Sequence, residues 1–118
     1  MSSGIRESDW KVFRRIHPVV LGRFCERILS EINRLATDTS TSSHERYLLI
    51  FELIKQRDAD IAAAFNDFRR STAERQLAIM HSRDLLTQEE LALFSSETQE
   101  TVKSSSEIYG APKKPRRK

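Results

Sequence analysis

The chain has 118 residues, of which 38% are hydrophobic and 31% charged, and its net charge is +3. This length predicts a single soluble domain that buries enough surface to fold without metal or disulfide help. Neither a membrane span nor a secretory signal is expected, because no uncharged stretch is long enough and the N-terminus lacks an apolar core.

The distribution of glycine and proline indicates an all-α fold. Neither residue occurs between Arg23 and Tyr109, although β-turns depend on them, whereas helix-forming residues are abundant there. We expect an antiparallel bundle of about four helices over residues 1–103 and a flexible linker with a basic tail over residues 104–118. The alternative is a longer hairpin that completes its core by forming a dimer.

The first helix is predicted to begin at Ser8 and to bury one apolar stripe. The residues of this stripe recur at three- and four-residue steps: Trp10, Phe13, Ile16 or His17, Val20, Leu21, Phe24, Ile28, Ile32 and Leu35. Pro18 interrupts the stripe, so we expect a kink there, or a short helix ending near His17 and a new one opening at Pro18. The arginines along this helix are expected to pair locally with Glu26 and Glu31.

A polar loop at residues 37–43 separates this helix from the next, which either Ser42 together with Glu45 or Ser43 alone is expected to cap. The buried face of the second helix is predicted to contain Tyr47, Leu48, Phe51, Leu53 and Ile54, and Phe51→Ala is expected to cost about 3–5 kcal/mol. A break near residues 57–60 would let Asp58 or Asp60 cap a third helix. Without that break, one helix of about 58 Å would run from His44 to Ser82 and need a partner chain.

The last helix is predicted to begin after Thr87, with Glu90 three residues on completing a capping box. Its inward residues are Leu91, Phe94 and Val102, and the linker begins at Ser104. The predicted core combines these with the large residues of the earlier helices: Trp10, Phe13, Phe24, Ile28, Phe51, Ile54, Phe65, Leu91 and Phe94.

No residue pattern of a catalytic or cofactor site occurs in the chain, so we expect neither an enzyme nor a cofactor. The histidines lack metal-ligand spacing; His44 and His81 would meet beside Glu45 only if the chain turned back near Asp58. Cys25, the single cysteine, is interpreted as a small buried residue, and its lack of a disulfide partner suggests a cytoplasmic location.

Arg69, Arg70 and Arg75 lie in a stretch with little apolar cover. One interpretation is a solvated face whose arginines pair with Asp67 and Glu74. The other is a recognition surface for an acidic partner or a nucleic acid.

The basic tail "PKKPRRK" resembles a short nuclear-import signal and also the basic ends of small nucleic-acid-associated proteins such as ribosomal ones. Removing its five positive charges from the net charge of +3 leaves −2 for residues 1–111, so the chain without its tail is slightly acidic. The tail charges are Lys113, Lys114, Arg116, Arg117 and Lys118. They could attract phosphates without sequence preference.

These features favour a protein-interaction module, without catalytic activity, that binds a protein partner or forms a homodimer. The alternative is a nucleic-acid-associated accessory protein that contacts phosphates weakly and non-specifically through the tail and through the surface formed by Arg69, Arg70 and Arg75.

Overall fold

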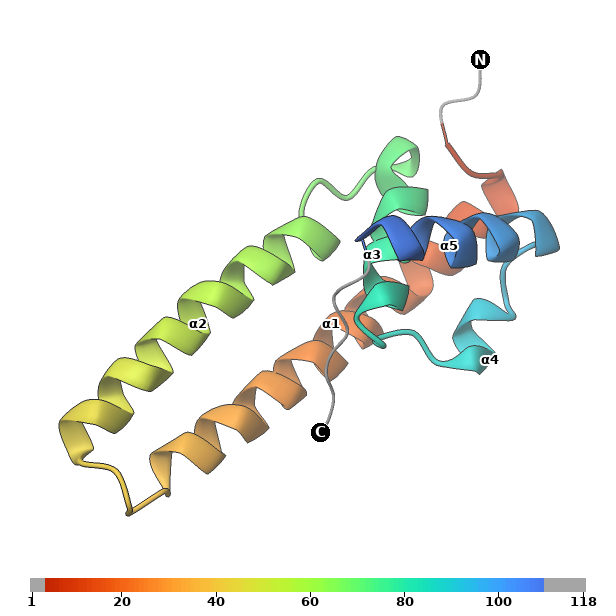
Figure 1. The fold of residues 1–118 in the computed structure, drawn as a ribbon. Coiled ribbons are helices and arrows are strands. Elements are labelled where there is room, and N and C mark those ends of the chain that lie inside the picture. Colours follow the sequence, from red (N-terminus) through yellow and green to blue (C-terminus); the bar gives the residue numbers. More distant parts are fainter. Residues whose placement is uncertain (1–3, 110–118) are drawn as a thin grey trace.

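The computed structural model describes residues 4–109, which contain five α-helices and one short 3₁₀ turn, with no strand in that range. The all-α prediction is therefore confirmed for this part of the chain. The architecture is a long two-helix hairpin with three shorter helices gathered around one end of it (Figure 1). A four-helix antiparallel bundle is not confirmed.

The hairpin consists of α1 (Glu7–Ala36) and α2 (Ser43–Phe65). The predicted loop between them is confirmed, and Ser42 caps α2 because its hydroxyl accepts a hydrogen bond from the Glu45 backbone N–H at 3.1 Å. Arg46 fixes the tip of the hairpin, since its guanidinium donates to the carbonyls of Ala36 at 2.6 Å and Thr41 at 3.1 Å. Arg46 of α2 thus holds both the end of α1 and the loop in place.

Two expected interruptions of these helices are absent. α1 continues through Pro18, and the predicted kink or restart there is not confirmed. Pro18 and Arg14 are both exposed, so the Arg14 carbonyl, which loses its helical partner to the proline, can bond to water. α2 continues through residues 57–60 to Phe65, so the predicted break near Asp58 is wrong.

The chain turns instead at Asn66–Phe68, where Asp67 has a φ of 59°. Aspartate and asparagine tolerate this left-handed conformation better than most residues. The turn leads into η1 (Arg70–Thr72) and α3 (Ala73–Ser82). Arg69 and Arg70 thus lie in the turn and the 3₁₀ segment that precede α3.

α3 ends in a Schellman motif that uses aspartate where glycine is usual. Asp84 has a φ of 59°. The Leu85 N–H donates to the Met80 carbonyl at 2.9 Å, and the Asp84 N–H donates to the His81 carbonyl at 3.0 Å. These two bonds define the motif, and the buried side chains of Leu85 and Met80 supply its usual apolar contact.

The predicted last helix is divided into α4 (Gln88–Leu91) and α5 (Ser96–Tyr109). The capping box at Thr87 is confirmed, with both reciprocal bonds to Glu90 at 3.0 Å. Glu90 also forms a two-pronged ion pair with Arg23 of α1, both contacts being 2.9 Å. α5 continues six residues beyond the predicted helix end at residue 103, and Ser106 on it is buried.

We call α3, α4 and α5, with the loops between them, the body; it packs on the N-terminal half of α1. α3 contacts α5 more extensively than any other element does. Asp9 of α1, only 2% exposed, accepts hydrogen bonds from the residues that begin α5: Ser95 N–H at 2.8 Å, Ser95 Oγ at 2.7 Å and Thr98 Oγ1 at 2.7 Å. This contact joins the two ends of the described chain.

The core lies where the body meets the hairpin, and most of its predicted members are buried there. Phe13, Phe24, Ile28, Phe65, Leu91 and Phe94 are buried, and Trp10 is partly buried against them. The prediction is wrong for Phe51 and Ile54, which are exposed. In α2 the only buried residues are Ala64 and Phe65, in its last turn.

The rest of the hairpin projects away from the body (Figure 1). The radius of gyration is 16.4 Å, whereas a compact domain of this length has about 13 Å. The principal extents of 55 × 27 × 24 Å reflect the same projection. The outer part of α2 therefore contacts α1 along one side and is otherwise open.

Candidate functional site

The projecting hairpin exposes a group of large apolar side chains on one side. Tyr47 is 64% exposed, Leu29 58%, Phe51 53% and Ile54 48%. We call these four residues and the half-buried Cys25 the hairpin face. Isolated exposed apolar residues are ordinary on protein surfaces, but a contiguous group this large commonly marks an interaction site.

A groove of about 210 Å³ shows that residues of the two helices meet on this side. Its lining comes from both helices: Cys25, Ile28, Leu29, Ile54, Arg57, Asp58 and Ile61. Phe51 and Tyr47 precede Ile54 by three and seven residues, so helical spacing places them beside it along α2. The face is thus a shallow apolar surface supported by two helices.

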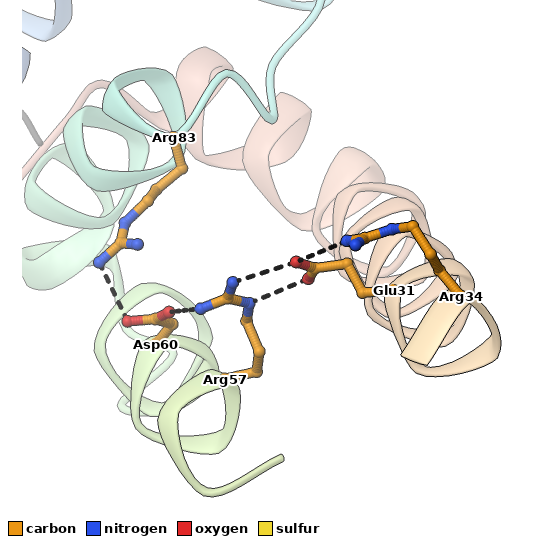
Figure 2. A network of polar contacts seen from close by, with 5 residues as sticks. All are labelled: Glu31, Arg34, Arg57, Asp60 and Arg83. Atoms are coloured by element: carbon orange, nitrogen blue, oxygen red, sulfur yellow. Dashed lines mark hydrogen bonds and ion pairs between the residues drawn. The ribbon is translucent and has the colours of Figure 1, made fainter. Parts of the chain in front are cut away.

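A chain of alternating charges holds these helices together (Figure 2). Arg57 of α2 lies 3.3 Å from Glu31 of α1 and 3.5 Å from Asp60 one turn along its own helix. Arg83, just after α3, lies 3.0 Å from Asp60, and Arg34 lies 4.0 Å from Glu31. The pairs at Arg57 are half-buried, which makes them less screened than exposed pairs.

Most of this ion-pair chain lies away from the hairpin face, although Arg57 lines the same groove as Ile54. At 3.6 residues per turn, Asp60 points about 120° away from Ile54. The charges therefore connect α2 to α1 and to the body, and Arg57 is both part of this ion-pair chain and part of the groove lining. A rigid support with an open apolar side is suited to binding another helix.

The sequence-based prediction identified the residues of the hairpin face but placed them in the core. Tyr47, Leu48, Phe51 and Ile54 were expected to be buried and are exposed, and Leu53 is half-buried. A usable signal was present: seven of the eight residues from Tyr47 to Ile54 are apolar. One α1-facing stripe needs only about half of them, so the remainder had to face something else.

The three arginines singled out from the sequence each have a carboxylate partner. Arg69 pairs with Asp67 at 2.6 Å and Arg75 with the same carboxylate at 3.9 Å, as expected for a solvated face. Arg70 donates to the Ile5 carbonyl at 2.6 Å and pairs with Glu7 at 3.0 Å. Arg69 holds the pKa of Asp67 below its usual range through a hydrogen bond. These arginines therefore connect the turn to itself and to the N-terminal segment.

The basic residues of α1 pair less locally than expected. Arg34 contacts Glu31 as predicted, but Arg23 reaches Glu90, and Arg27 donates to the Asp84 carbonyl at 2.8 Å. These contacts attach α4 and the segment before it to α1. The predicted tail residues Lys113, Lys114, Arg116, Arg117 and Lys118 lie outside the described residues.

The histidines do not come together, because the turn near Asp58 on which that alternative depended does not occur. His44 lies at the start of α2, at the hairpin tip, whereas Nδ1 of His81 lies 3.1 Å from the Ser106 hydroxyl on α5. Within residues 4–109 no group of three or more ligand-type side chains is arranged to hold a metal ion. In the same range no helix is long and apolar enough to cross a membrane.

His17 has a different setting, packed among aromatic rings where α2 ends against α1. Its ring centroid lies 4.2 Å from that of Phe68 and 5.4 Å from that of Phe65. Burial lowers the pKa of His17, although a contact of 3.2 Å between Nε2 and the Phe65 carbonyl works in the opposite direction. His17 thus serves packing between the helices.

No family model matches the chain, and comparisons with curated proteins and with solved structures find no significant match.

Proposed function

We propose that this protein is a small helical interaction module that acts by binding through the hairpin face and not by catalysis. The observation that carries the proposal is the exposure of Tyr47, Phe51, Ile54 and Leu29 on one side of a projecting hairpin. Aromatic side chains on a rigid support are typical of the residues that dominate protein–protein binding.

The hairpin is mixed in charge, which favours a protein partner over a nucleic acid at this surface. From Val19 to Ile61 the sequence has six basic and seven acidic side chains. A phosphate-binding surface needs an excess of positive charge, because neutralisation of phosphates drives that kind of binding. The apolar face is therefore the part of the hairpin that offers binding energy.

A charged substitution on the face tests the proposal. Phe51→Glu places a carboxylate in the middle of the apolar surface and should abolish binding to whatever proteins the full-length chain captures. Leu93→Glu is the matched control, since Leu93 is 51% exposed but lies outside the hairpin. Captured proteins should be lost with Phe51→Glu and kept with Leu93→Glu.

The same experiment addresses the alternative, a nucleic-acid accessory role for the tail and for Arg69, Arg70 and Arg75. Nuclease treatment and removal of residues 112–118 are added as separate arms. If partners survive Phe51→Glu but are lost on nuclease treatment or tail removal, the interaction module is refuted and the alternative takes its place.

A further inference from the structure

We infer that the occupant of the hairpin face is the same face of a second copy, so that two hairpins form an antiparallel four-helix bundle. This inference rests on the proposed function and names its partner. A hairpin with an open apolar side is half of such a bundle, because each copy supplies the two helices that the other lacks. The interface would be isologous, with one surface patch facing itself across a two-fold axis.

The spacing of residues along α2 fits this symmetry. Tyr47, Phe51, Ile54 and Asp58 follow one another at intervals of four, three and four residues, and this order reads the same in both directions. Two copies of α2 packed antiparallel about the centre of this stripe bring Phe51 opposite Ile54 of the partner subunit. They also bring Tyr47 opposite Asp58 of the partner subunit.

The outer pair of this stripe is chemically complementary. Asp58 lines the groove, and its carboxylate has no hydrogen bond or ion pair among residues 4–109. The Tyr47 hydroxyl also has no partner in that range. A phenol donates readily to a carboxylate. Within one chain these two residues are eleven positions apart on a helix, about 16 Å, and cannot meet. Across the two-fold axis they face each other.

The two-fold rotation also determines how the rest of the hairpin would lie. The same rotation lays α1 antiparallel on α1 of the partner subunit, with Leu29 at the contact, and leaves the two bodies at opposite ends of the bundle. Six basic and seven acidic side chains from Val19 to Ile61 leave the overlapping segments close to neutral. Two identical surfaces of this kind do not repel each other over long range.

The available area predicts a weak, reversible dimer. Tyr47 and Phe51 expose on the order of 200 Å² of side chain, since aromatic residues bury roughly 150–250 Å² each when fully covered. Leu29 and Ile54 add about 100 Å² at roughly half of a full aliphatic side chain each. At about 65% apolar area, typical of homodimers, the whole interface is on the order of 1,000 Å². This is the lower limit for a specific contact, so we expect a Kd on the order of 10 μM.

Sedimentation equilibrium of the full-length protein tests the inference. The weight-average mass should rise from monomer to dimer between about 1 and 500 μM, a range that brackets the expected Kd. Phe51→Glu should weaken the dimer at least about tenfold, and Leu93→Glu should leave it unchanged. Because Phe51 is half exposed, the variant monomer should keep its helical signal, which circular dichroism checks.

A charge swap tests the register independently. Tyr47→Glu should weaken the dimer by about tenfold, since it faces a carboxylate. Combining Tyr47→Glu with Asp58→Lys should restore the Kd to within about threefold of the original at low salt, and added salt should remove that rescue. If the double variant instead shows the sum of the two losses in dimer affinity, the inference is overturned, because residues 47 and 58 then do not meet across the interface.

The failure of this inference and the failure of the proposed function give different results. The wild-type protein could stay monomeric throughout the concentration range while other proteins are captured through Phe51. This result overturns the inference of a second copy as the partner but agrees with the proposed interaction module. A monomer with no Phe51-dependent capture overturns both.

Discussion

The buried carboxylate of Asp9 allows a quantitative test of how the chain ends are joined. Asp9 is 2% exposed and accepts three hydrogen bonds from Ser95 and Thr98 at the start of α5. Its negative charge also lies at the positive end of the α5 dipole. Asp9→Ala removes all three acceptor contacts and leaves the Ser95 N–H and two hydroxyls without their partner.

The expected cost of Asp9→Ala is about 3–5 kcal/mol in the free energy of unfolding. A hydrogen bond to a charged group contributes roughly 1.5–3 kcal/mol, but three bonds to one carboxylate do not add fully. Asp9→Asn keeps the shape and most of the bonding capacity, so it should cost less, about 1–2 kcal/mol. Urea unfolding followed by circular dichroism measures both values, and Glu100→Gln on the exposed side of α5 serves as the control.

The pH dependence of these differences in the free energy of unfolding provides a further test of the role of Asp9. Burial alone would raise the pKa of Asp9, but the hydrogen bonds from Ser95 and Thr98 outweigh it and lower the pKa below the ordinary value of 3.8. A lowered carboxyl pKa means that the stabilisation is complete above about pH 4 and is lost as the pH falls further. The difference in the free energy of unfolding between wild type and Asp9→Asn should therefore become smaller below about pH 4. A cost of Asp9→Ala below about 1 kcal/mol, or a gap that does not change with pH, would refute this reasoning.

Three further outcomes follow from single residues. Gly22 lies within α1, where an added Cβ would meet no atom within 4 Å, so Gly22→Ala should raise the free energy of unfolding by about 0.5–1 kcal/mol in denaturant titration. Asp84→Gly should also stabilise, by about 1 kcal/mol, because it relieves a φ of 59° and keeps the carbonyl that Arg27 binds; a destabilised variant would show that the Asp84 side chain matters. Burial lowers the pKa of His17, so below about pH 6.5 the unfolded chain binds a proton at His17 more readily than the folded chain does. The free energy of unfolding should therefore fall as the pH drops below about 6.5, and His17→Gln should flatten that part of the stability profile.

Features decided by a few neighbouring residues could be predicted from the sequence. Ser42 and Thr87 cap their helices as expected, since capping depends on residues three positions apart. The all-α fold also follows from the lack of glycine and proline between residues 23 and 109. In their place Asp67 and Asp84 adopt the left-handed conformation at the two sharpest turns.

Features that depend on contacts between residues distant in the sequence could not be predicted in this way. Asp58 or Asp60 was expected to cap a third helix, but both lie inside α2, where Asp60 pairs with Arg57 and Arg83. The turn came seven residues later, where Asn66 and Asp67 lie together. Asp9 likewise stands in the first turn of α1, where an acidic residue is ordinary, and no nearby residue in the sequence indicates its partners Ser95 and Thr98, which are 86 and 89 residues away.

The largest error of the sequence-based prediction was to place Phe51 and Ile54 in the core. It has a physical reason that links the sequence to the proposed function. The apolar content of residues 47–54 exceeds what one neighbouring helix can cover, and the assumption that all of it lies in the core of one chain was wrong. In the monomer Phe51 is half exposed, so its truncation should cost far less than the roughly 3–5 kcal/mol expected for a core position. In a dimer the same side chain would be covered, and its contribution would appear only as stability that increases with protein concentration. A local excess of apolar residues beyond what the monomer buries is therefore better explained by an interface than by a core.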